Sequence, residues 1–196
     1  ATTLFGRSEL VPKASAATAG DIPFSDGATG FNYDHDNFFW DNTNKRLGIG
    51  TANPSEQIDL QTDGNSRIIC TSYGDSVFPG FVGRRARGTK ASPSAVLTND
   101  ILGGIGGRGR GANDWSDLSR ALITLHAAEN WSDTAQGAFI AFMTTPPGST
   151  NPTERMRISP SGNVGIGTSS PSQKLHVKDG IARVENSAPS GFDIRN

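Results

Sequence analysis

Short stretches of alternating apolar and polar residues recur along the chain, with turn residues between them. Alternation with a period of two is typical of β-strands, one face of which packs inward. No segment keeps a 3.6-residue period through three turns; the nearest is 114–130, where Gly and Ser in the flanks favour a strand at 121–127. The pattern therefore predicts an all-β chain, with strands at 67–71, 80–85, 101–110, 121–127, 137–145 and 155–158.

The stretch 137–145 is apolar on both sides of the expected strand. Phe139, Ala141 and Met143 fall on one face, and Ile140 and Phe142 fall on the other. A strand with two apolar faces is typical of the centre of a sheet or of a subunit interface. We therefore expect burial on both faces.

An internal repeat is the strongest feature of the sequence. Residues 47–60 match residues 164–177 without a gap, each residue lying 117 positions after its counterpart. Gly, Ile, Gly, Thr, Pro and Ser are identical in the two copies, and a polar turn precedes each. Self-similarity of this kind indicates one supersecondary unit used twice.

Each copy contains a Gly-Ile-Gly strand. Two glycines on alternate positions leave one strand face without side chains, so that another backbone or a bulky ring can lie against it, while the Ile projects to the other face. The unit is too small to bury itself and needs neighbours. The residues expected to pack in an assembly are Gly48, Ile49, Gly50, Gly165, Ile166 and Gly167.

Composition excludes several classes of protein. Charged residues make up 19% and hydrophobic residues 34%, with 24 Gly, which does not describe a charge-rich disordered chain. The net charge of −1 gives no electrostatic basis for nucleic-acid binding or for an anionic membrane surface, and no apolar run is long enough to span a bilayer. Cys70 is the single cysteine, so no internal disulfide is expected, and we predict a small buried residue in a strand.

The stretch 163–177 resembles the recurring unit of bacteriophage tail-fibre and related virion fibre proteins. Residues 39–47 resemble another form of the same unit, and the likeness extends over roughly 20–180, including 83–89, 100–104, 144–150 and 154–158. The resemblance implies an elongated homotrimeric β-rich segment of a viral tail or head fibre. The partners it implies are the chain itself, other virion tail or fibre proteins, and a glycan or protein receptor on the host surface.

This reading divides the chain into five parts. Residues 1–30 are expected to form an extended linker or stalk and 31–62 a first fibre repeat. Residues 63–155 would form a β-sandwich-like insert, 156–180 a second fibre repeat, and 181–196 a tail or the start of another segment.

Two motifs point to ligands but fit a plainer interpretation. Residues 104–109 satisfy G-x-G-x-x-G, yet no apolar helix follows and only Glu129 lies at a plausible spacing for a ribose-binding acid, so a closely packed Gly-rich strand is favoured over a nucleotide site. The second motif is a set of five arginines in two short clusters. Few aromatic residues lie between them, which favours solvated strand faces or interchain ion pairs over nucleic-acid binding. The arginines are Arg84, Arg85, Arg87, Arg108 and Arg110.

Metal and catalytic sites have little support. Asp34, Asp36 and Asp41 surround His35 but lack the pattern of a calcium loop, so a polar turn is favoured; a metal on a three-fold axis stays open. Asp114 and Asp117 form the only pair that a glycosidase could use, and turn residues explain it better. We expect no enzyme, no cofactor and no metal. A polysaccharide depolymerase and a cellular surface adhesin are the alternatives.

Two tryptophans carry the one candidate for receptor contact. Trp115 and Trp131 bracket the strand at 121–127, and each lies among Asn, Asp and Ser. An aromatic ring beside amides and carboxylates is typical of a sugar-binding surface. The alternative is that both rings cap the ends of a sandwich core.

Overall fold

The computed structural model describes residues 18–25 and 31–183, and this part of the chain contains thirteen strands and no helix. The all-β prediction is confirmed. The chain divides into two compact units, Ala1–Pro79 and Gly80–Asn196. The described residues include no helix that could cross a membrane. Most of the predicted stalk 1–30 and tail 181–196 lies outside the described residues.

The first unit contains a three-stranded sheet. Strands β3 and β4 are antiparallel, whereas β5 returns parallel to β4. The Asp41 carboxylate accepts the backbone N–H groups of Thr43 (2.9 Å) and Asn44 (3.0 Å), which closes the turn between β3 and β4. A short pair, β1 and β2, precedes the sheet. The strands are β1 Phe24–Ser25, β2 Phe31–Asn32, β3 Phe38–Asp41, β4 Arg46–Ile49 and β5 Ile58–Leu60.

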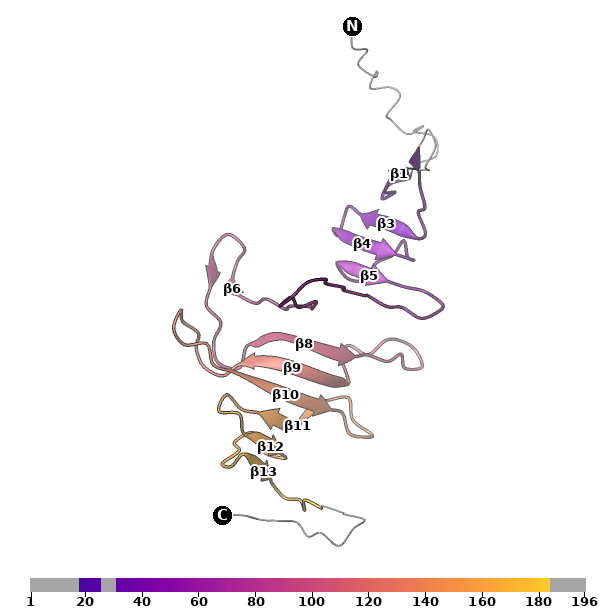
Figure 1. Ribbon diagram of the computed structural model, residues 1–196. Helices are drawn as coiled ribbons and strands as arrows, with labels where there is room; N and C mark the ends of the chain where they lie inside the picture. The colour runs from indigo at the N-terminus through magenta and orange to yellow at the C-terminus, as the bar shows by residue number, and fades with distance from the viewer. Residues whose placement is uncertain (1–17, 26–30, 184–196) are drawn as a thin grey trace. The chain divides into compact units, whose positions relative to one another are not determined.

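The second unit is built on a six-stranded sheet in the order β13-β12-β11-β10-β9-β8 (Figure 1). All neighbours are antiparallel except β12 and β13, which are parallel. A two-stranded ribbon, β6 with β7, precedes the sheet in the chain. The strands are β6 Arg87–Gly88, β7 Pro93–Ser94, β8 Ile101–Gly107, β9 Ala121–Ala127, β10 Ala138–Thr144, β11 Thr153–Ile158, β12 Val164–Ile166 and β13 Leu175–Val177.

The sequence repeat is also a structural repeat. In each copy an antiparallel pair is followed by a parallel strand, as β3-β4-β5 and as β11-β12-β13. The hydrogen bonds correspond: the N–H of Leu47 donates to the carbonyl of Gln57, and that of Val164 to the carbonyl of Lys174, both at 2.8 Å. The same three-stranded unit therefore makes up the whole of the first sheet and one end of the six-stranded sheet.

Burial in the six-stranded sheet is one-sided. Phe139 and Ala141 of β10 are 6% and 1% exposed, with the guanidinium of Arg157 3.9 Å above the Phe139 ring and His126 stacked on it. On the opposite face, Ile140 and Phe142 are only half-buried. Burial of this strand on both faces, as its sequence predicts, is thus not reached within one chain.

Three local expectations are wrong. The stretches 67–71 and 80–85 are not strands, and the insert forms one sheet with the second repeat where a sandwich-like module was expected. Cys70 is exposed and lies outside any strand. For 67–71, which includes Cys70, and for 80–85, the reason is that a strand needs a partner, and the described chain pairs neither stretch with another strand. Ile69 (80% exposed) and Phe81 (73%) consequently remain in solvent.

Candidate self-association surface and tryptophan loops

A row of apolar side chains crosses all six strands of the large sheet. Residues paired between adjacent strands project to the same face. The pairing therefore places one residue from each strand in a single row on one face: Ile105, Ile123, Phe142, Met156, Ile166 and Val177.

A second row runs beside the first on the same face. On each strand, the residue of the second row lies two positions along the chain from the residue of the first row. Its members are Gly103, Leu125, Ile140, Ile158, Val164 and Leu175. We call the two rows together the apolar face.

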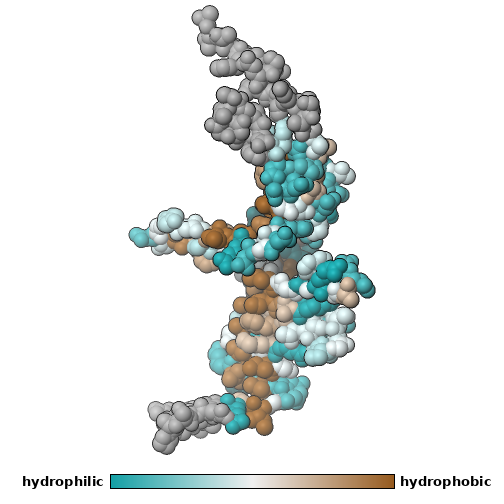
Figure 2. Space-filling view, turned by 90° about the vertical axis from the view of Figure 1, so that its right-hand side faces the viewer, coloured by the Kyte–Doolittle hydropathy of each residue, from teal (hydrophilic) through white to brown (hydrophobic). Residues whose placement is uncertain are grey.

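The apolar face is open to solvent in the single chain. Ile105 is 80% exposed, Leu175 58%, and Ile123, Leu125 and Ile166 are each 42% exposed. Figure 2 shows apolar residues gathered in a strip along this unit, with polar residues beside it. Monomeric soluble proteins rarely leave so large a continuous apolar surface uncovered.

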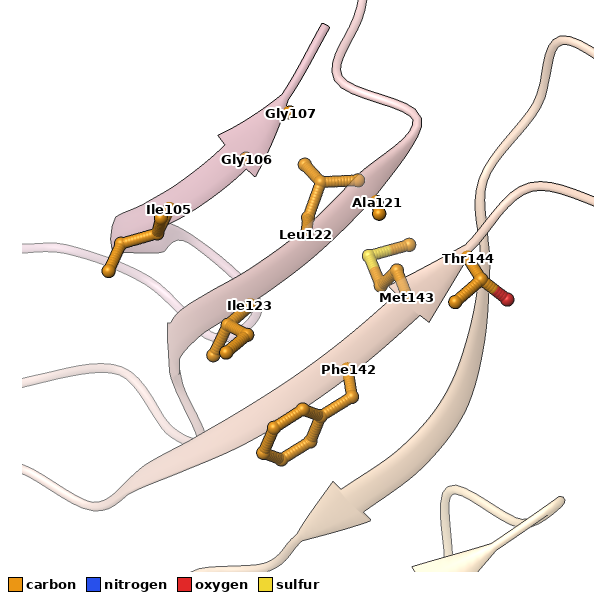
Figure 3. Close-up of a pocket in the computed structure, with 9 residues that line it drawn as sticks. All are labelled: Ile105, Gly106, Gly107, Ala121, Leu122, Ile123, Phe142, Met143 and Thr144. Carbon is orange, nitrogen blue, oxygen red and sulfur yellow. The ribbon is translucent and has the colours of Figure 1, made fainter. Parts of the chain in front are cut away.

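The apolar face contains a shallow hollow near its β8 end. The hollow has a volume of about 320 Å³ and is lined from β8, β9 and β10. Figure 3 shows Ile105, Ile123 and Phe142 projecting to the same side from these three strands. Phe81 and Val82 lie beside Ile105 and extend the apolar lining. The hollow has the character of a packing surface, with few polar groups that could orient a substrate.

The first unit presents a small version of the same face. Phe38, Ile49 and Leu60 form one cross-strand row. Trp40, Leu47 and Ile58 form the other, and Trp40, Ile49 and Ile58 are 38%, 37% and 66% exposed. Each copy of the repeat therefore carries two apolar rows on one face of its sheet.

The glycines of the repeat are required by their own chain. A side chain at Gly48 or Gly165 would run into the carbonyl of the Thr three residues later. Gly50 and Gly167 have φ of 75° and 73°, in the left-handed region that favours glycine. The predicted close approach of a backbone is present, and that backbone belongs to the same chain.

The six residues expected to pack in an assembly thus fall into two groups, the isoleucines and the glycines. Ile49 and Ile166 lie on the apolar rows, where they are 37% and 42% exposed. The glycines shape the turns that hold these isoleucines in place. Their role in contacts between chains stays a prediction.

The two candidate tryptophans occupy different surroundings. Trp115 is 63% exposed, in a turn whose neighbouring carboxylate, Asp114, accepts the Trp115 backbone N–H. Trp131 is half-buried; its indole N–H donates to the carbonyl of Gly137 at 3.0 Å, and its backbone N–H donates to the carbonyl of Val96. Only the Trp131 ring is fixed by contacts to neighbouring loops that the structure shows.

The paired carboxylates of the Trp115 loop have separate partners. Asp117 forms an ion pair with Arg120 at 2.6 Å, and the hydrogen bond from this guanidinium lowers the pKa of Asp117 below its usual value. Asp114 accepts the backbone N–H of the adjacent Trp115 at 2.7 Å. Both carboxylates are therefore held by groups of their own loop, which agrees with their interpretation as turn residues.

The acidic stretch near residue 35 is a turn held by its own polar groups. Asp34 accepts the side-chain N–H groups of Asn37, and Asp21 lies 2.6 Å from the His35 ring. Among the described residues no three His, Cys, Asp or Glu side chains gather as metal ligands would.

The G-x-G-x-x-G stretch lies largely in β8 and serves packing. A side chain at Gly104 would come 2.8 Å from the carbonyl oxygen of Ile123, and the backbone of Gly83 lies close against Leu102 and Gly103. The residues after it form turns and then β9. The stretch therefore opens no helix that could bind a pyrophosphate.

Sequence reasoning missed the ion-pair cluster around Asp100. This carboxylate is 7% exposed and accepts hydrogen bonds from Arg87 (2.6 and 2.8 Å), Arg85 (3.0 Å) and the Leu97 backbone N–H (2.9 Å). These contacts, that of Arg87 first, hold the pKa of Asp100 well below its usual value. No local pattern signals the cluster because the arginines precede Asp100 by 13 and 15 residues.

Comparisons with known proteins give a partial likeness. No protein-family model and no curated protein matches the chain. A solved structure of the carboxy-terminal domain of the bacteriophage T5 L-shaped tail fibre is similar, with 22% identity and a TM-score of 0.45, over 52% of this chain and 36% of that one. The same domain solved with its intramolecular chaperone domain is 22% identical with a TM-score of 0.46, over 52% of this chain and 25% of that one. The chain thus spans well under half the length of either.

Proposed function

We propose that this chain is a structural segment of a bacteriophage tail or head fibre, and that it assembles as a homotrimer through the apolar face. The observation that carries the proposal is the pair of unbroken apolar rows across β8 to β13. The resemblance of the repeat to virion fibre proteins supports the choice of a fibre. The role needs no catalytic step.

The energetics favour covering the whole face at once. Full burial of one Ile or Leu side chain contributes about 1.5–3 kcal/mol. Association costs about 4–15 kcal/mol in lost motion, so no single side chain can drive it. The rows offer eleven apolar side chains from six strands, and a closed ring of three chains would bring three such faces together.

A matched pair of variants tests the role of the face. Ile105 lies on the apolar face and is 80% exposed, whereas Ile181 lies beyond β13 and is 93% exposed. Because both side chains are in solvent in the single chain, neither Ile105→Asp nor Ile181→Asp should disturb its own fold. In the trimer, Ile105→Asp places a charge in an apolar contact at a cost of several kcal/mol.

We expect light scattering at micromolar concentration to give trimer mass for Ile181→Asp and monomer mass for Ile105→Asp. Circular dichroism should show the same β-content for both. Trimer mass for both variants would place the interface elsewhere and contradict the proposal.

A further inference from the structure

A small polar pocket lies beside Trp131 in the second unit. It has a volume of about 210 Å³ and is formed by residues 85–96 together with residues 131–136, which lie far from them in sequence. Its lining residues are Arg85, Ser94, Ala95, Val96, Trp131, Ser132, Asp133 and Gln136.

The pocket is held in shape before any ligand arrives. The Trp131 ring is tied to Gly137 and its backbone to Val96, each at 3.0 Å, and Val96 is 3% exposed. Gln136 donates from Nε2 to the carbonyl of Ser132 at 3.1 Å. A ligand would therefore lose little to ordering of the protein.

Among the residues that line the pocket, Arg85 carries a positive charge that is only partly matched. Arg87 donates two hydrogen bonds to the Asp100 carboxylate. Arg85 donates one to the same carboxylate, from Nη2 at 3.0 Å. Two guanidinium groups thus share one carboxylate. The Arg85 side chain is 41% exposed and keeps donors for a second anion, and guanidinium is well suited to a carboxylate.

The rest of the pocket suits hydroxyl groups and an apolar ring face. The Asp133 carboxylate and the Gln136 side-chain carbonyl oxygen are hydrogen-bond acceptors, whereas the Ser132 hydroxyl already accepts the backbone N–H groups of Thr134 and Ala135. An indole offers a flat apolar surface on which the C–H face of a sugar can stack. A ligand that carries both an acid group and hydroxyls would therefore meet a cation and hydrogen-bond acceptors in the same pocket.

We propose that this pocket binds a single acidic sugar residue, one that carries a carboxylate, of a host-surface glycan. The carboxylate pairs with Arg85, the ring packs on Trp131, and hydroxyls donate to Asp133. The proposal deepens the fibre function proposed above, because a fibre trimer would present three such pockets and gain avidity from weak single contacts. It assigns the contact to Trp131 and none to Trp115.

The test follows the indole N–H resonances of chain labelled with ¹⁵N-tryptophan during titration with methyl glucuronide, methyl glucoside or inorganic phosphate. We expect the Trp131 resonance to shift, with a dissociation constant for the glucuronide at least about tenfold lower than for the glucoside. Arg85→Gln should bring the two constants together, since Arg87 still holds Asp100 in that variant. Trp115→Phe, the matched control, should change neither.

The proposal is overturned if methyl glucuronide leaves the Trp131 resonance unmoved, or if Arg85→Gln keeps the preference for the acid. Phosphate binding more tightly than the glucuronide would overturn the ligand class. Mass measured on the same samples separates the two proposals. Trimer mass without glucuronide binding removes only the pocket, and binding by a monomer removes only the trimer.

Discussion

At the residue scale, the repeat keeps its glycines because two different constraints act on them. Gly48 and Gly165 face a carbonyl that leaves no room for a Cβ atom. Gly50 and Gly167 adopt left-handed backbone angles, which cost an L-residue about 1–2 kcal/mol. The sequence predicted the close approach from the alternate glycines, but it could not separate these two reasons because both produce the same residue.

Gly167→Val should lower thermal stability much more than Ser169→Val. The new side chain would meet the carbonyl oxygen of Lys178 at 2.8 Å from a strained backbone, whereas Ser169 is exposed in a turn. A loss of 2 kcal/mol or more corresponds to a melting temperature lower by roughly 4–8 °C in a chain of this size. Circular dichroism melts of the two variants check this, and equal melting temperatures would show that the site tolerates a side chain.

Also at the residue scale, the residue types around Trp115 and Trp131 do not distinguish the two tryptophans. Both lie among Asn, Asp and Ser, and only the fold brings the carbonyl of Val96 to the Trp131 backbone and that of Gly137 to the Trp131 ring. Contacts across more than thirty residues of sequence, such as that between Val96 and Trp131, leave no local signal. The sequence could therefore single out the tryptophans as a residue type but could not locate a pocket, and receptor contact at either tryptophan stays a prediction.

At the element scale, alternation predicted the strands that have partners. The strand at 121–127 has the predicted bounds, and β8, β10 and β11 differ from the predicted ranges by no more than three residues at an end. The stretches 67–71 and 80–85 have the same alternation and no pairing. The β-propensity of a segment ignores its neighbours, whereas a strand is stabilised by pairing with other strands. Sequence patterns alone therefore predict more strands than the fold contains.

The glycines of β8 give a test at this scale. A Cβ atom at Gly104 would lie 2.8 Å from the carbonyl oxygen of Ile123, whereas a Cβ atom at Gly107 would have no neighbour within 4 Å. Gly104→Val should therefore destabilise the sheet by about 1–3 kcal/mol, and Gly107→Val should be close to neutral. Urea unfolding midpoints of the two variants measure the difference. An equal loss at both positions would mean that something not seen in the single chain packs on Gly107.

At the scale of the whole molecule, the two faces of the large sheet are unequally covered. The large sheet buries one face with Phe139 and Ala141 and leaves the other face apolar and uncovered. The net charge of −1 gives little repulsion between copies. Eleven apolar side chains fall into two rows only because of the register between strands that are separated in sequence. The sequence therefore pointed to Ile49 and Ile166 and missed the continuous face.

The mass of the unmodified chain in solution is the most direct measurement of this claim. Sedimentation equilibrium from low to high micromolar concentration should give three times 20.6 kDa. The mass should persist in 1 M salt, because screening weakens ion pairs and leaves apolar contacts intact. An unmodified chain that sediments at 20.6 kDa throughout this range would contradict the account, since its apolar face would then not drive assembly.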